Sequence, residues 1–238
     1  HQTGGVFYLR IEDTDQKREV EGAVEAVIDA MTLYGVHFDE GVTKDGETGA
    51  YGPYRQRQRK TLYQTVAKSL VVRGLAYPCF CSEEALAEMH AQQEAAKESF
   101  YGYYGKYAVW RDRSLEDIKA ELAKGTDWVL RFRSDGDPQN TVTVKDGIRG
   151  DVKVQENYTD FVLLKSDGIP TYHFAHVCDD HFMRTTHVIR DESWLATLPI
   201  HVQLFDTLRW ERPVYCHTAT LMKMDGSSKR KLSKRRDL

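Results

Sequence analysis

The sharpest chemical signal in the sequence is a pair of lysines three residues apart in a basic segment. The segment reads Lys231-Leu232-Ser233-Lys234-Arg235 and follows a loop that contains glycine and serine. Two ammonium groups at this spacing can both reach one polyphosphate, and cations there stabilise the charge that builds on a leaving pyrophosphate. The pattern indicates nucleotide chemistry, and a solvated basic loop is the alternative if the motif is taken by itself.

Two charged residues elsewhere in the chain fall where a predicted strand ends. Glu12 follows a strand of aromatic and branched residues at 6–11, and Arg190 closes a strand at 187–190. In parallel α/β sheets a ligand sits beyond the carboxyl ends of the strands. Glu12 and Arg190 are therefore candidate binding residues.

Helices with regular apolar spacing accompany these strands. Apolar residues three and four apart predict a helix over 20–33, with its N-cap among Asp13, Thr14 and Asp15. A glycine-rich loop is expected over 41–53. Further helices are predicted at about 57–72, 82–97 and 192–208 and after an N-cap at Ser114, and further strands at 129–133, 142–145, 152–154 and 161–164.

Strand–helix alternation at both ends of the chain, with a different block between them, predicts an α/β fold. The expected organisation is a parallel-sheet core in two parts, 1–76 and 158–238, which a mixed α/β insertion at 77–157 interrupts.

The composition excludes several classes of protein. Hydrophobic residues make up 41% of the 238 residues, which is enough for a buried core, and no apolar run reaches the ~18 residues of a membrane span. No signal peptide is visible, and four cysteines are too few and too scattered for a disulfide framework. These features predict a cytoplasmic protein without membrane partners. The net charge of −3 is not that of a nucleic-acid binder as a whole, so the basic segment is a local feature.

Five segments in a fixed order resemble the glutamyl-tRNA synthetases, which are class I enzymes with a Rossmann-like catalytic core. They are 9–15 (L-R-I-E-D-T-D), 165–175 (K-S-D-G-I-P-T-Y-H-F-A), 179–183 (D-D-H-F-M), 188–190 (V-I-R) and the closing K-L-S-K-R. The string R-I-E-D-T-D separates this group from glutaminyl enzymes, whose equivalent reads more like R-F-D-D-T-N. The resemblance covers essentially the whole chain.

This resemblance implies an amino-acid site. Glu12 matches the carboxylate that meets the substrate amino group, and Arg190 matches the arginine that grips the substrate side-chain carboxylate. Tyr172 matches a tyrosine that lines the same pocket, although a core aromatic is the alternative. His176 stands where relatives have asparagine and is assigned to the glutamate pocket, while Asp191 is an unusual neighbour that could compete for Arg190.

The resemblance also implies an ATP site. Lys231 and Lys234 match the phosphate-handling lysines of the second class I signature and are the expected catalytic residues, with Ser233 between them. Trp194 matches a tryptophan near ATP, although core packing explains it almost as well. Mg²⁺ is expected as the companion of ATP.

Cys79-Phe80-Cys81 raises the question of a metal. Some relatives bind a structural zinc through two such cysteines and downstream ligands, and here Tyr103 and Tyr107 fall at the downstream positions. A tyrosine hydroxyl is a poor zinc ligand because its pKa is ~10. We therefore expect no structural zinc.

Two other groups of reactive residue types are read as structural. Cys178 and Cys216 are expected to be packing residues, and Asp179 and Asp180 a helix-capping pair beside a structural His181.

The expected activity is that of a ligase that joins glutamate to the 3′ end of tRNA(Glu) through glutamyl-adenylate. The partners would be ATP, L-glutamate and the tRNA acceptor end, and a monomer is expected. The 77–157 block resembles the element near the acceptor end. An aromatic core is the expected role of its aromatic cluster, with stacking on exposed bases as the alternative; the cluster consists of Tyr101, Tyr103, Tyr104, Tyr107 and Trp110.

The first class I signature, an H-x-G-H-like motif, is absent from these residues. We therefore expect a partial catalytic domain that cannot complete the adenylate by itself. One alternative is the paralogue that glutamylates a modified base, a glutamyl-queuosine tRNA(Asp) synthetase; another is a non-catalytic nucleotide- or RNA-binding module.

Overall fold

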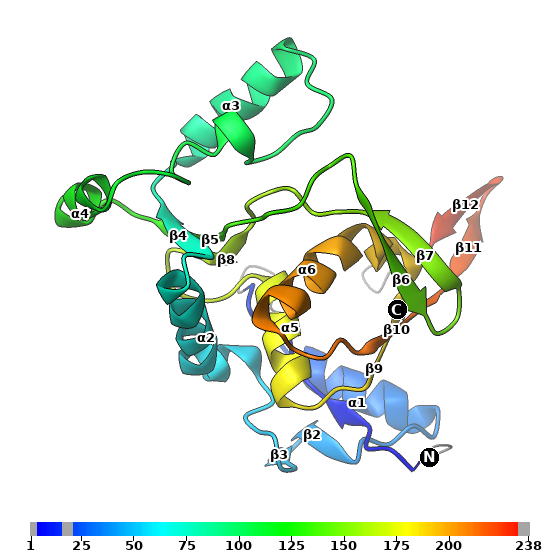
Figure 1. The fold of residues 1–238 in the computed structure, drawn as a ribbon. Helices are drawn as coiled ribbons and strands as arrows, with labels where there is room; N and C mark the ends of the chain where they lie inside the picture. The colour runs from blue at the N-terminus through cyan, green and yellow to red at the C-terminus, as the bar shows by residue number, and fades with distance from the viewer. Residues whose placement is uncertain (1–3, 16–20, 233–238) are drawn as a thin grey trace. The chain divides into compact units, whose positions relative to one another are not determined.

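The computed structural model describes residues 4–15 and 21–232, which fold into two compact units (Figure 1). Each unit combines two stretches of the sequence. The first unit holds His1–Asp135 and Tyr158–Met183, and the second holds Gly136–Asn157 and Arg184–Leu238.

The first unit contains two small sheets and most of the helices. Its elements are β1 (Tyr8–Leu9), α1 (Ala23–Leu33), β2 (Glu40–Thr43), β3 (Gly46–Thr48), η2 (Gln56–Arg59, a 3-10 helix), α2 (Lys60–Val72), β4 (Ala76–Cys79), α3 (Glu83–Ala95), η3 (Gly105–Tyr107, a 3-10 helix), α4 (Leu115–Ala123), β5 (Val129–Phe132), β8 (Val162–Leu164) and α5 (Tyr172–Phe182).

The first sheet corrects one prediction, because part of the glycine-rich stretch at 41–53 is a hairpin and not a loop. β2 pairs in parallel with β1 and antiparallel with β3. Gly41 is required at this crossing: its φ is +113°, and a side chain there would lie 2.3 Å from the Leu9 carbonyl oxygen.

The start of α1 also differs from the prediction. The helix begins at Ala23 after Gly22, which offers no side-chain cap, so the expected N-cap at 13–15 is wrong. The Asp13 carboxylate instead accepts a hydrogen bond from the backbone amide of Arg57 at 2.9 Å and holds the start of η2.

The second sheet of this unit carries the buried core. β5 lies between β4 and β8 and is antiparallel to both, and α2 and α5 pack beside it (Figure 1). α2 turns Tyr63, Val66, Ala67 and Leu70 inward, which is the three-and-four spacing seen in the sequence. α5 follows β8 after a short turn, so its first residues lie close to that strand.

The second unit is built around a parallel strand pair. Its elements are β6 (Thr141–Asp146), β7 (Gly150–Gln155), β9 (His187–Asp191), η4 (Glu192–Thr197, a 3-10 helix), α6 (Leu198–Leu208), β10 (Val214–Thr218), β11 (Met222–Asp225) and β12 (Ser228–Lys231).

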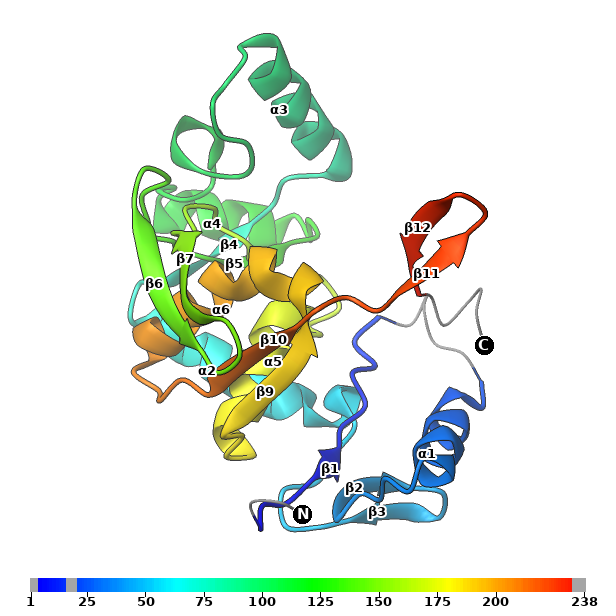
Figure 2. The ribbon, with the colours of Figure 1, turned by 90° about the vertical axis from the view of Figure 1, so that its right-hand side faces the viewer.

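Figure 2 shows β9 and β10 side by side, with the β11–β12 hairpin after them. One buried cluster of this unit contains Val144, Leu198, Val202 and Tyr215. The β6–β7 hairpin packs against β10 and α6, so residues 136–157 share a unit with Arg190. The division at 77 and 157 drawn from the sequence remains a prediction. Within the described residues, no helix has both the length and the apolar character needed to cross a membrane.

Candidate functional site

Glu12 lies just beyond β1 and is oriented by Arg10. The Arg10 Nη2 donates to Glu12 Oε1 at 3.1 Å, and Arg10 Nη1 donates to Asp180 Oδ1 at 2.9 Å. The side chain of Glu12 is 37% exposed, whereas that of Arg10 is 10% exposed. Burial lowers the pKa of Arg10, but Asp180, Glu12 and Asp179 outweigh it and raise this pKa. Glu12 is thus a solvent-facing carboxylate on a buried, permanently charged support.

Asp179 is the buried centre of this support, which corrects the prediction of a helix-capping pair. Its carboxylate accepts hydrogen bonds from Gln56 Nε2 at 2.9 Å, Arg59 Nε at 2.7 Å and the Tyr63 hydroxyl at 2.8 Å. Burial, and then the Asp179 charge, raise the pKa of Tyr63, so the hydroxyl remains a donor. Asp179 and Asp180 lie inside α5 because they bind cations and donors from other elements.

Tyr172 and His176 lie one turn apart on α5. Their rings stack at 5.6 Å between centroids with an interplanar angle of 25°. His176 is buried, and its Nε2 lies 3.1 Å from Asp180 Oδ2. Their assignment to a glutamate pocket stays a prediction; the structure places His176 beside Asp180, the carboxylate that binds Arg10, and Tyr172 against the His176 ring.

Arg190 lies on β9 inside a cradle of three aromatic side chains. Its guanidinium carbon is 4.8 Å from the centroid of the Tyr215 ring. Its Nε donates to His217 Nε2 at 2.9 Å, and its Nη1 lies 3.2 Å from His201 Nδ1. The Nη2 atom is buried and has no hydrogen-bond partner in the part of the chain that the structure describes. A buried donor without a partner costs about 1–3 kcal/mol, so an acceptor from a ligand would be stabilised there.

Asp146 closes this cradle from the β6–β7 hairpin. Its Oδ2 lies 2.6 Å from His217 Nδ1, and its Oδ1 accepts from the backbone amides of Ile148 and Arg149 at 2.9 Å each. Gly147 lets the hairpin approach β10, because a side chain there would lie 2.7 Å from the Cys216 sulfur. Burial raises the pKa of Asp146, but the hydrogen bonds from His217 and from the backbone amides outweigh it and lower that pKa to about 2.

The low pKa of Asp146 predicts an acid-sensitive second unit. Because the folded state holds the charged form, the stabilisation is complete above pH ~4 and is lost as the pH falls towards 2. This lowering of the Asp146 pKa corresponds to about 2 kcal/mol of folding stability. Urea unfolding of wild type and of Asp146→Asn at pH 6 and pH 3 measures this contribution. Wild type should be the more stable protein at pH 6, and the difference in free energy of unfolding should shrink at pH 3. An equal gap at both values would contradict the assignment.

Lys231 is the part of the basic motif that the structure describes; Ser233 and Lys234 lie outside the described residues. The Lys231 ammonium donates to Asp191 Oδ1 at 2.8 Å and to the Ser193 hydroxyl at 3.0 Å. Asp191 therefore binds Lys231 and the start of η4, and this interaction lowers the pKa of its carboxyl group. Trp194 lies on η4 with 37% of its surface exposed, and its role in ATP binding stays a prediction.

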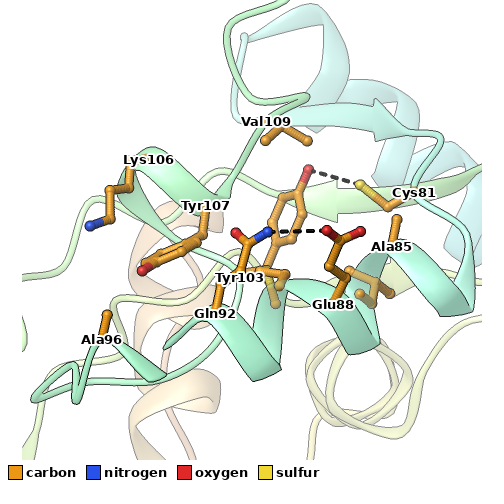
Figure 3. Close-up of a pocket in the computed structure, with 11 residues that line it drawn as sticks. Cys81, Ala85, Glu88, Gln92, Ala96, Tyr103, Lys106, Tyr107 and Val109 are labelled. Carbon is orange, nitrogen blue, oxygen red and sulfur yellow. Dashed lines mark hydrogen bonds between the residues drawn. The ribbon is translucent and has the colours of Figure 1, made fainter. Parts of the chain in front are cut away.

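Cys81 lines a pocket of about 590 Å³ together with Tyr103 and residues of α3 (Figure 3). The Tyr103 hydroxyl lies 3.4 Å from the Cys79 sulfur and 3.6 Å from that of Cys81. Burial, followed by the two thiols, raises the pKa of Tyr103, which makes a phenolate ligand less accessible. The Tyr107 hydroxyl donates to Glu98 at 2.9 Å.

These four side chains do not fit a zinc site, since one hydroxyl stays protonated between the thiols and the other serves a carboxylate. Within residues 4–15 and 21–232, no group of three His, Cys, Asp or Glu side chains could hold a metal ion. The aromatic core expected in this block is confirmed for Tyr103, Tyr107 and Trp110, which pack with Tyr77 and Met89.

The sequence predicted Glu12 and Arg190 as binding residues but not the residues that hold them. Arg10 and Asp180 are 170 positions apart, and Asp146 and His217 are 71 apart. Only one signal was available: charged or polar residues inside segments that otherwise read as buried. Asp179-Asp180 in an apolar helix and His217 between strand residues both meet this criterion.

Comparison with known proteins gives one consistent result. The family model for the catalytic domain of class I tRNA synthetases (E and Q) matches residues 1–238. The glutamate–tRNA ligase of Acetivibrio thermocellus is 58% identical over 237 residues, which cover 100% of this chain and 43% of that protein. The glutamate–tRNA ligase of Clostridium perfringens (strain SM101 / Type A) is 53% identical over 238 residues, with the same coverage.

A solved structure agrees with these relatives. The crystal structure of a glutamate tRNA ligase from Elizabethkingia meningosepticum, in complex with its amino acid, matches with a TM-score of 0.84 at 38% identity. The match covers 98% of this chain and 46% of that one. The predicted fold class, an α/β Rossmann-like core, is thereby confirmed. The chain spans less than half the length of the relatives that it matches.

Proposed function

The chain belongs to the class I tRNA synthetases (E and Q), of which it matches the catalytic domain, and on this premise we propose that it contributes to the activation of glutamate for transfer to tRNA. One observation supports glutamate as the substrate: Arg190 keeps a buried Nη2 donor without a partner among the described residues, inside its aromatic cradle. A guanidinium only donates hydrogen bonds, so it favours a carboxylate over the amide of glutamine.

In the proposed reaction, a glutamate α-carboxylate oxygen attacks the α-phosphorus of ATP, and pyrophosphate leaves. The 3′-terminal hydroxyl of tRNA then attacks the carbonyl carbon, and AMP leaves. Glu12 pairs with the substrate ammonium, and Arg190 binds the side-chain carboxylate. Neither group reacts, so their contribution is position and charge.

Lys231 and Lys234 are proposed to neutralise the phosphates, with Ser233 and Trp194 as further ATP contacts. Magnesium would arrive with ATP and be held chiefly by phosphate oxygens and water. The four cysteines are free thiols, which supports a reducing compartment such as the cytosol.

The test is ATP–pyrophosphate exchange with the complete gene product that contains these 238 residues. Exchange that depends on glutamate and cognate tRNA, with little response to glutamine, is expected. Exchange with glutamine, or none in a folded protein that binds tRNA, would contradict the proposal. Nuclease digestion of the product separates the 3′-end ligase from the paralogue, since the first leaves labelled glutamate on the terminal adenosine and the second leaves it on an internal modified nucleoside.

Replacing Lys231 with alanine should lower kcat of the exchange by roughly tenfold to a hundredfold, because an ammonium that stabilises the leaving pyrophosphate acts mainly in the transition state. The KM for glutamate should change little. The matched control is Lys229→Ala, because Lys229 lies two residues before Lys231 on the same strand, β12. An unchanged kcat in Lys231→Ala would assign this lysine to its structural contacts with Asp191 and Ser193.

A further inference from the structure

The cradle of Arg190 holds two imidazoles whose protonation can be worked out from their partners. His217 is fully buried between Asp146 and Arg190, with Nδ1 2.6 Å from a carboxylate oxygen and Nε2 2.9 Å from the arginine Nε. A carboxylate at this pKa only accepts, and a guanidinium only donates. The proton of His217 therefore resides on Nδ1, and Nε2 accepts the Nε–H of Arg190.

The second imidazole obeys the same constraint. His201 on α6 is fully buried, and its Nδ1 lies 3.2 Å from Arg190 Nη1, so this nitrogen also accepts. The rings of His201, Tyr215 and His217 lie nearly parallel, with centroid spacings of 6.3 and 6.0 Å and interplanar angles of 15° and 19°. Two acceptors thus take up Nε and one Nη1 hydrogen, and Nη2 is left for a ligand.

We propose that Asp146 and His217 form a carboxylate–imidazole–guanidinium relay that positions Arg190 for the side-chain carboxylate of the amino-acid substrate. This inference rests on the proposed function, and it adds two positioning residues that do not touch the substrate themselves. Asp146 fixes the tautomer of His217, and His217 fixes the rotation of the guanidinium, which decides where the free Nη2 points.

The hairpin that carries Asp146 is itself anchored to β10. The Gly147 amide donates to the Tyr215 carbonyl at 2.7 Å, and Arg149 Nε donates to the His217 carbonyl at 3.0 Å. Arg149 also pairs with Glu192 on η4. The carboxylate of Asp146 is therefore held against His217 from both sides of the turn.

The variant Asp146→Asn tests the relay at one atom. Asparagine keeps one side-chain oxygen, and we expect this oxygen to accept the hydrogen bonds from the backbone amides of Ile148 and Arg149. Its NH₂ group then faces His217 Nδ1 and moves the imidazole proton to Nε2, where it opposes the Nε–H of Arg190. We expect the KM for glutamate to rise by about tenfold, while the KM for ATP changes little; the protein stays folded at neutral pH, with the loss of stability expected above for this variant.

His217 variants separate positioning from packing. His217→Gln places an amide oxygen near the Nε2 position and should retain most of the affinity for glutamate, whereas His217→Phe keeps the ring volume and should lose it. In the His217→Gln background, Asp146→Asn should have no further effect on KM, because the tautomer it controls is gone. Asp151→Asn, an exposed carboxylate on the same hairpin, is the control and should match wild type.

A second measurement requires only the folded wild-type protein. The ¹⁵N resonances of His217 should report a neutral ring with its proton on Nδ1 at pH 7. A proton on Nε2 would overturn the relay, and so would equal KM values for glutamate in wild type, Asp146→Asn and His217→Phe. Failure of the proposed function is a different outcome: wild type itself would then show no glutamate-dependent exchange, and the ¹⁵N spectrum would be unaffected.

Discussion

Replacing Arg190 with lysine is expected to raise the KM for glutamate by about a hundredfold or more in the exchange assay. The three donors of an ammonium sit on one nitrogen, so a lysine cannot span the separate positions at which the Nε, Nη1 and Nη2 atoms of Arg190 meet His217, His201 and a ligand carboxylate. Loss of one partner of a desolvated, hydrogen-bonded charge pair costs about 2–5 kcal/mol, which covers a range from tens to thousands in affinity.

The matched control is Arg212→Lys in the same unit. Arg212 pairs with Asp206 at the surface, with 34% of its side chain exposed, and this pair is worth ~0–1 kcal/mol. The control should retain wild-type KM values for glutamate and ATP. If Arg190→Lys also retained its KM for glutamate while its melting temperature fell, Arg190 would be a structural cation, and the substrate assignment would be lost with it.

Replacing Asp179 with alanine is expected to destabilise the protein by about 3–5 kcal/mol. The carboxylate is fully buried and serves Arg59, Tyr63 and Gln56, while Arg10 Nε lies 3.7 Å away. Removing it leaves two buried guanidinium groups with less compensation, and breaking a buried charge network in this way costs several kcal/mol. Urea unfolding monitored by circular dichroism measures the loss.

Two further variants make this result specific. Asp179→Asn keeps the shape and one acceptor, so its loss of stability should lie between those of alanine and wild type. Asp29→Ala removes a carboxylate that is 63% exposed and paired with Lys44 on the surface, and it should cost less than ~1 kcal/mol. A similar small loss for Asp179→Ala would show that the buried network contributes little net stability.

Local signals predicted most of the secondary structure. Ser114 caps α4 in a capping box with Asp117, as predicted. The helix predicted from 82 onward corresponds to α3, where Ser82 accepts a hydrogen bond from the Ala85 amide. The strand patterns at 129–133 and 187–190 correspond to β5 and β9. These features depend on residues a few positions apart, which is the range over which periodicity and caps carry information.

The misses have a common physical cause, because each depends on partners far away in the sequence. The hairpin of β2 and β3 forms where β2 passes β1, and its glycines read as a loop when that strand is not considered. Aspartate is a residue type typical of helix caps, yet the partners of Asp179, Arg59 and Tyr63, come from a segment about 120 positions earlier. Glu12 and Arg190 were predicted from the strand ends and from the family resemblance. Arg10 lies in one of the resembling segments, but its contact with Asp180 and the contact between Asp146 and His217 match no motif and appear only in the folded chain.

The discontinuous second unit has a practical consequence for protein engineering. A chimera that exchanged residues 77–157 as one cassette would carry away the hairpin with Asp146 and leave His217 behind. Exchanging 77–135 instead would keep residues 136–157 beside Arg184–Leu238. Cassette boundaries for swapping the block between relatives therefore belong near 135 and 158, with 136–157 inherited from the same parent as Arg190.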